Sequence, residues 1–86
     1  MKTYNFIIYT EEMRAKNISS FELMQLCAYG GVEAFPSGAI VQFLDKNDAI
    51  KAVKRLKEKG FGIGIEDICE VDNPSIEEIS NGIQNT

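Results

Sequence analysis

Residues 3–10 predict a β-strand, because β-branched and aromatic side chains dominate the stretch and occupy both of its alternating faces. One face consists of Tyr4, Phe6 and Ile8, and the other of Asn5, Ile7 and Tyr9. Both faces are mainly apolar. We therefore expect the strand to lie in the middle of a sheet that is covered on both sides.

A charged segment, residues 11–17, is expected to form a loop before the first helix. Ser19 and Glu22 have the spacing of a capping box, and Ile18 and Leu23 stand where a hydrophobic staple packs. These local signals predict a helix that begins at Ser19.

Glycines at positions 30 and 31 are expected to end this helix. Short strands are predicted at residues 32–35 and 39–44, on either side of the turn residues Pro, Ser and Gly at 36–38.

The second helix has the clearest pattern. Asp45 or Asn47 is expected to cap its start, and Gly60 has the position of a left-handed residue after its end. Phe61 then lies where it can pack back on Leu56, as in a Schellman motif. The predicted buried stripe is Ala49, Ile50, Val53 and Leu56.

A last strand is expected within residues 63–71, with an irregularity at residues 66–67. Residues 73–75 then open a short third helix, since Ser75 and Glu78 again have capping-box spacing. Its apolar residues share one face and are Ile76, Ile79 and Ile83.

The predicted order is strand, helix, strand, strand, helix, strand and a short helix, which is typical of the ferredoxin-like βαββαβ fold. We expect an α+β protein with a four-stranded antiparallel sheet and two helices on one face. Residues 1–72 are assigned to this domain, and residues 73–86 to the short C-terminal helix and tail. A chain of 86 residues has room for one such core.

The residue types present limit which catalytic, phosphate-binding and metal sites the chain can form. The chain has no histidine, which removes the commonest general base and metal ligand. Glycines at 62 and 64 lack the strand-then-helix context of a phosphate-binding loop, and the acids between 66 and 72 lack a calcium-loop spacing and are expected to be solvated. We therefore expect no catalytic residues, no cofactor and no metal.

We infer the cellular compartment from the cysteines, from the lack of a secretion signal and from the shortness of the apolar runs. Cys27 and Cys69 lie in apolar surroundings without a secretion signal, so they are expected to be buried and reduced. No apolar run approaches the roughly 18 residues of a membrane span. These features predict a cytoplasmic protein with no membrane partner.

The charge is unevenly distributed. Residues 46–59 carry six basic and two acidic side chains, whereas residues 60–86 carry six acidic and no basic ones. The basic residues of the predicted second helix are Lys46, Lys51, Lys54, Arg55, Lys57 and Lys59. This stripe has two interpretations: a surface for phosphates or an acidic protein, or an ordinary solvated helix face. In either case Lys51 and Arg55 are expected to point away from the core, so that reversing both charges leaves the fold intact.

The stretch from Ser37 to Leu56 resembles the third strand and second helix of an RNA-recognition motif (RRM), over about a quarter of the chain. ACT-type ligand-binding domains have a similar succession of strand and helix. The resemblance implies the ferredoxin-like fold, and it keeps the core positions Ala39, Val41 and Phe43. The outward positions that carry a basic residue and two base-stacking aromatics in RRMs are here Pro36, Gly38 and Ile40. The resemblance therefore argues against RNA binding by the sheet face.

The same alignment predicts an apolar sheet face opposite the helices, which consists of Ile7, Tyr9, Ile40 and Leu44, with Gln42 among them. An uncovered patch of this kind is rare on soluble monomers. We expect it to be an interface, covered by the C-terminal helix through Ile76, Ile79 and Ile83 or by a second copy of the chain.

These expectations favour a small non-enzymatic module that regulates or inhibits a protein partner through the sheet face and the basic second helix, with self-association as a homodimer. One alternative is an RNA- or DNA-binding protein that uses the basic helix. A second is an ACT-like sensor of a small molecule, and a small enzyme comes last.

Overall fold

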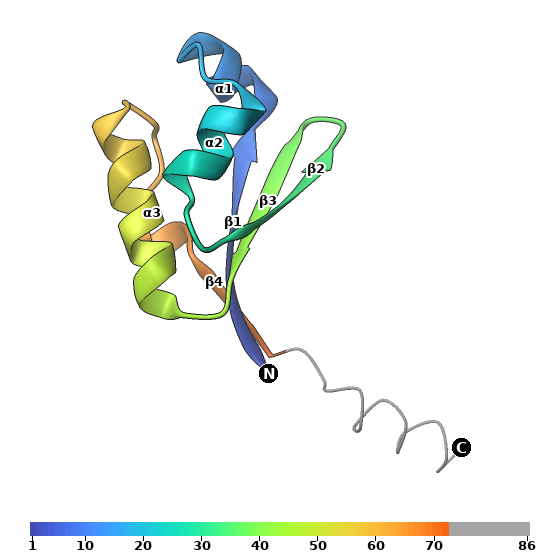
Figure 1. Ribbon diagram of the computed structural model, residues 1–86, viewed down its shortest axis with the longest axis vertical. Coiled ribbons are helices and arrows are strands. Elements are labelled where there is room, and N and C mark those ends of the chain that lie inside the picture. Colours follow the sequence, from blue (N-terminus) through green and yellow to red (C-terminus); the bar gives the residue numbers. More distant parts are fainter. Residues whose placement is uncertain (73–86) are drawn as a thin grey trace.

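A computed structural model of the protein describes residues 1–72, in which four strands form one antiparallel sheet (Figure 1). The strands are β1 (Lys2–Tyr9), β2 (Gly31–Phe35), β3 (Gly38–Phe43) and β4 (Cys69–Asp72), in the spatial order β2-β3-β1-β4. β1 lies between β3 and β4, as its apolar faces predicted. The fold is α+β.

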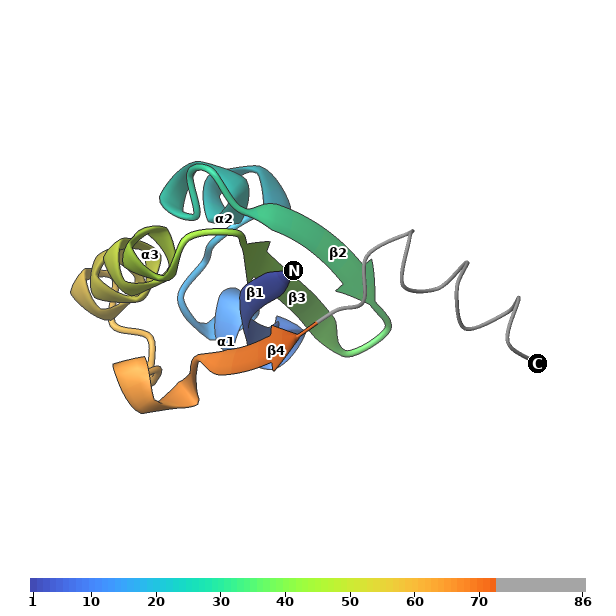
Figure 2. The same cartoon turned by 90° about the horizontal axis from the view of Figure 1, so that it is seen from below.

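In the described part of the chain, three α-helices accompany the sheet: α1 (Thr10–Ala15), α2 (Ser20–Leu26) and α3 (Lys46–Glu58). Figure 2 shows α2 and α3 on one side of the sheet, and α1 follows β1 directly at the end of that strand. The core lies between these helices and the sheet. It includes Phe6 and Ile8 of β1, Val41 and Phe43 of β3, Leu23 of α2, and Val53 and Leu56 of α3.

The prediction of a loop at residues 11–17 was wrong, because most of this segment forms α1. Met13 anchors the helix, since its side chain is buried in the core. Two glutamates in the first turn and Arg14 in the last match the helix dipole. A single buried residue in six gives no helical periodicity, which is why the sequence pattern did not indicate this element.

Both predicted helix starts are confirmed. The Ser19 hydroxyl accepts a hydrogen bond from the Glu22 amide at 3.2 Å. Asp45, rather than Asn47, caps α3, and its carboxylate accepts the Asn47 amide at 2.7 Å. Each bond satisfies an amide that has no partner within the helix.

The helix ends differ in how well they were predicted. At α3, Gly60 has φ +91°, the Phe61 amide donates to the Leu56 carbonyl at 3.1 Å, and the Gly60 amide donates to Lys57 at 2.9 Å. These bonds confirm the Schellman motif. At α2 the glycines do not end the helix. It stops at Leu26, and Tyr29 takes the left-handed conformation with φ 71°.

Burial corrects two further predictions. Cys27 is buried, but Cys69 is exposed at the start of β4, because β4 is an edge strand whose side chains are all exposed. Both cysteines are free thiols. Ile50 is only half-buried, and Ala52 takes a core place on α3 beside Ala49, Val53 and Leu56.

The predicted irregularity before the last strand is present as a 3-10 turn, η1 (Ile65–Asp67). The Asp67 carboxylate closes the turn by accepting the Gly64 amide at 2.8 Å. Glu66 therefore belongs to this turn and not to the strand edge. The predicted C-terminal helix with Ile76, Ile79 and Ile83 lies outside the described residues. Among the described residues, no helix has the length and apolar character needed to cross a bilayer.

Candidate interface on the open sheet face

Four of the predicted interface residues lie on the sheet face opposite α2 and α3, Leu44 follows directly after β3, and Ile76 and Ile79 lie outside the described residues. Ile7 of β1 pairs with Ile40 of β3, and Asn5 pairs with Gln42. Because side chains alternate along a strand, Ile7, Tyr9, Ile40 and Gln42 share this face. Their exposure confirms that the helices do not cover them. Ile7 is 45% exposed, Ile40 39%, Tyr9 57% and Leu44 69%. The segment predicted to cover this face, with Ile76, Ile79 and Ile83, lies outside the described residues, so cover on the second side stays a prediction.

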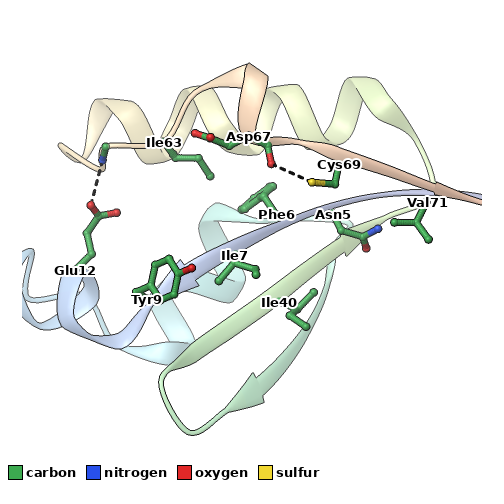
Figure 3. Close-up of a pocket in the computed structure, with 11 residues that line it drawn as sticks. Asn5, Phe6, Ile7, Tyr9, Glu12, Ile40, Ile63, Asp67, Cys69 and Val71 are labelled. Atoms are coloured by element: carbon green, nitrogen blue, oxygen red, sulfur yellow. Dashed lines mark hydrogen bonds between the residues drawn. The ribbon is translucent and has the colours of Figure 1, made fainter.

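A pocket of about 590 Å³ adjoins this apolar row (Figure 3). Asn5, Phe6, Ile7 and Tyr9 of β1 form one wall, and Gly62, Ile63 and Asp67 form the other. Ile40 of β3 and Cys69 and Val71 of β4 extend the lining onto the sheet. The volume falls within the range of roughly 300–1,000 Å³ typical of ligand pockets.

The pocket exists because β4 is shorter than β1. The two strands pair from Lys2 opposite Asp72 to Asn5 opposite Cys69, and the pairing stops there. The residues that would continue the pairing form η1 instead. Among the described strands, only β3 therefore pairs with the second half of β1.

One end of the pocket is closed by α1. The Glu12 carboxylate accepts a hydrogen bond from the Gly62 amide at 3.3 Å, which joins α1 to the segment after α3 (Figure 3). Glu12 and Asp67 are both acidic, and none of the lining residues is basic. Glu33 of β2 pairs with Ile40 and adds a third carboxylate to the open face. The face therefore combines an apolar centre with an acidic rim.

Sequence reasoning found the apolar row but not the second wall of the pocket. Glu12 was assigned to a loop, and Asp67 to a group of solvated acids. The available signal was the irregularity at residues 66–67, which marked where β4 stops pairing with β1. That irregularity did not indicate that a pocket would form beside β1.

The predicted basic residues lie on α3, away from the pocket. Lys46, Lys51, Lys54, Lys57 and Lys59 are exposed. Arg55 is different, because it is half-buried and its guanidinium donates to the Leu26 carbonyl at the end of α2, at 3.3 Å. The expectation that Arg55 only faces solvent was therefore wrong. Reversing its charge would disturb the contact between the two helices.

We expect Arg55→Gln to lower the free energy of unfolding by roughly 1 kcal/mol, the usual contribution of one such hydrogen bond. Lys51→Gln removes the same charge from an exposed position of the same helix. It is expected to change stability by less than about 0.5 kcal/mol. Urea denaturation of both variants measures the difference. Equal effects would contradict a structural role for Arg55.

Burial raises the pKa of the Cys27 thiol to about 11, and the nearby Arg55 charge offsets this only in part. Such a thiol stays protonated and inert at neutral pH. Residues 1–72 also contain no group of three or more His, Cys, Asp or Glu side chains placed to hold a metal ion.

Comparisons with known proteins give no match: neither a protein-family model, nor a curated protein, nor a solved structure is similar to this chain.

Proposed function

We propose that the protein is a non-enzymatic binding module that regulates or inhibits a protein partner by binding it through the open sheet face. The observation that carries the proposal is the exposed row of Ile7, Tyr9, Ile40 and Leu44 beside an acidic pocket. Exposed apolar side chains gathered on one face commonly mark interaction sites, because their burial removes unfavourable contact with water.

The arrangement of the face supports a protein partner. Interfaces commonly have an apolar centre with aromatic anchors, surrounded by a polar rim that excludes water. Ile7 and Ile40 provide the centre, Tyr9 is an amphipathic aromatic residue, Gln42 lies between Ile40 and Leu44, and Glu33 lies beside Ile40 on β2.

The strand order supports the ferredoxin-like assignment as part of this proposal. An antiparallel sheet in the order β2-β3-β1-β4, with α2 and α3 on one face, agrees with a βαββαβ arrangement to which α1 is added. The RRM resemblance belongs to the same proposal. Gly38 and Ile40 stand where that family places aromatics, which favours a protein over a nucleic acid on this face.

We expect Ile40→Lys to weaken partner binding or self-association at least about tenfold, because it places a charge in an apolar contact. The test is capture of the partner from the native host by the full chain, with and without nuclease, together with sedimentation of the purified protein. Gln25→Lys is the matched control, since it adds the same charge to an exposed position on α2.

Binding that survives nuclease and is lost only with Ile40→Lys would support the proposal. A protein whose partner capture and sedimentation are both unchanged by Ile40→Lys would contradict it. The predicted cover by Ile76, Ile79 and Ile83 can be tested in the same assay, by deleting residues 73–86. Removal of a covering segment should increase partner binding.

Nucleic-acid binding through α3 is the second candidate, favoured by the four exposed lysines of this helix and by the exposed Lys59 directly after it. Lys51 and Lys54 are the residues to reverse, since Arg55 also supports the fold. Loss of salt-sensitive RNA or DNA binding in the double Lys51→Glu, Lys54→Glu variant would favour this candidate. Each lost phosphate contact flattens the log–log salt dependence by about one unit.

A further inference from the structure

The second half of β1 has a free backbone edge that faces the pocket. β3 pairs with β1 from Tyr4 to Tyr9, but β4 pairs with β1 only from Lys2 to Asn5. In an antiparallel sheet, successive residues of a central strand direct their backbone groups alternately to the two neighbours. Within residues 1–72, the residues beyond Asn5 that point away from β3 therefore have no strand to pair with.

One hydrogen bond shows to which side each residue of β1 directs its backbone amide and carbonyl. The Thr10 amide donates to the Ser37 carbonyl at 3.0 Å, on the β3 side. By alternation Ile8 and Phe6 also bond towards β3, whereas Ile7 and Tyr9 direct their amides and carbonyls towards the pocket. Within the described residues, no backbone hydrogen bond joins Ile7 or Tyr9 to the opposite wall, residues 62–68.

We propose that the pocket receives an extended segment of the protein partner, which adds to β1 as a short strand at Ile7 and Tyr9. The inference rests on the proposed function and specifies how the partner binds. Main-chain hydrogen bonds to a free strand edge would provide affinity, and side-chain contacts would provide specificity.

The lining defines the chemistry of the segment. Side chains of an added strand alternate between two directions. One set would extend the apolar row of Ile7 and Ile40, and the other would pack beside Phe6 and Ile63, which are buried at the pocket wall. The carboxylates of Glu12 and Asp67 favour a lysine or arginine in the segment. The expected ligand is a basic peptide with alternating apolar residues.

Charge also distinguishes this occupant from the chain itself. The edge strands β2 and β4 carry Glu33, Glu70 and Asp72 and no basic residue. Residues 73–86 contain Glu77 and Glu78 and again no basic residue. Neither a second copy offering an edge strand nor the C-terminal segment complements an acidic pocket, whereas a basic peptide does.

The probe is a displayed library of random linear nine-residue peptides, selected against the full 86-residue chain. The best binder is then synthesised, and amide hydrogen exchange is followed by NMR. We expect selected peptides to alternate apolar residues and to contain lysine or arginine. Binding should slow exchange at the amides of Ile7 and Tyr9 at least about tenfold, because both become hydrogen-bonded.

Tyr9→Pro and Tyr9→Ala form the matched pair of variants. Both substitutions remove the tyrosine ring, but only proline also removes the backbone N–H donor. Proline should fit this position, because the Tyr9 φ of −88° is close to the value that proline requires. We expect Tyr9→Pro to bind the peptide at least about fivefold more weakly than Tyr9→Ala, the effect of one lost hydrogen bond. A peptide N-methylated at the amides that face β1 provides the same test with the unmodified protein.

The inference is overturned if no peptide is selected, if the two amides are not protected, or if N-methylation leaves affinity unchanged. Peptides that need Ile40 but protect neither amide would leave the open face as the interface and refute strand addition. Dimer formation through β1 would identify a second copy as the occupant and would also refute it. Insensitivity of partner capture to Ile40→Lys is a different result, which contradicts the proposed function.

Discussion

Replacing Leu56 with alanine is expected to lower the free energy of unfolding by about 2–5 kcal/mol, the usual cost of truncating a buried leucine. The Leu56 side chain is fully buried, and it lies on the α3 face that packs on the sheet. Its removal leaves a cavity. A core this small has few other side chains that could fill the cavity, so little of the lost packing energy is recovered. Chemical denaturation followed by circular dichroism measures the change.

Leu44→Ala is the matched control, because it makes the same substitution at a side chain that is 69% exposed. We expect a change in stability within about 0.5 kcal/mol, but weaker partner binding, since Leu44 belongs to the open face. The two leucines thus separate folding from binding. Similar destabilisation by both substitutions would show that the open face is covered in the native protein.

Replacing Gly38 with alanine is expected to cost about 3 kcal/mol, near the upper end of the usual range for overpacking. An added Cβ would lie 2.5 Å from the Ile8 carbonyl oxygen and 3.2 Å from the Tyr9 Cα. Both atoms belong to the backbone of the central strand, so neither can move without disturbing the β1–β3 pairing.

Gly31→Ala provides the comparison at the other end of the same hairpin. Its added Cβ would meet only the Gln42 carbonyl, at 4.0 Å, and its φ is not in the left-handed region. We expect a stabilisation of about 0.4–1 kcal/mol, because alanine restricts the unfolded chain. Thermal unfolding of the two variants should therefore shift in opposite directions. A lowered melting temperature for both would contradict the steric explanation.

Local signals predicted much of the fold because the interactions behind them are local. The Ser19 cap, the Asp45 cap and the hydrogen bonds around Gly60 each join residues at most five positions apart. Their chemistry can be read directly from adjacent letters of the sequence. The apolar row was also predictable, since alternation along two strands decides which side chains share a face.

The features that were missed depend on contacts between distant segments. The hydrogen bond from Arg55 to Leu26 spans 29 positions, and the bond from Gly62 to Glu12 spans 50. The pocket depends on where β4 stops pairing with β1, which is a property of two strands at opposite ends of the described chain. No periodicity in either strand contains that information.

Acidic and basic side chains lie on different sides of the molecule, which gives it an electric dipole. The carboxylates of Glu12, Glu33 and Asp67 lie at the open face, and α3, which carries exposed lysines, lies on the other side of the sheet (Figure 2). A cationic partner that diffuses towards the protein is turned towards the sheet face before contact, and an anionic one towards α3. The association rate of a basic partner should fall as ionic strength rises, while its dissociation rate changes little. Since the two sides do not overlap, occupation of one leaves the other accessible.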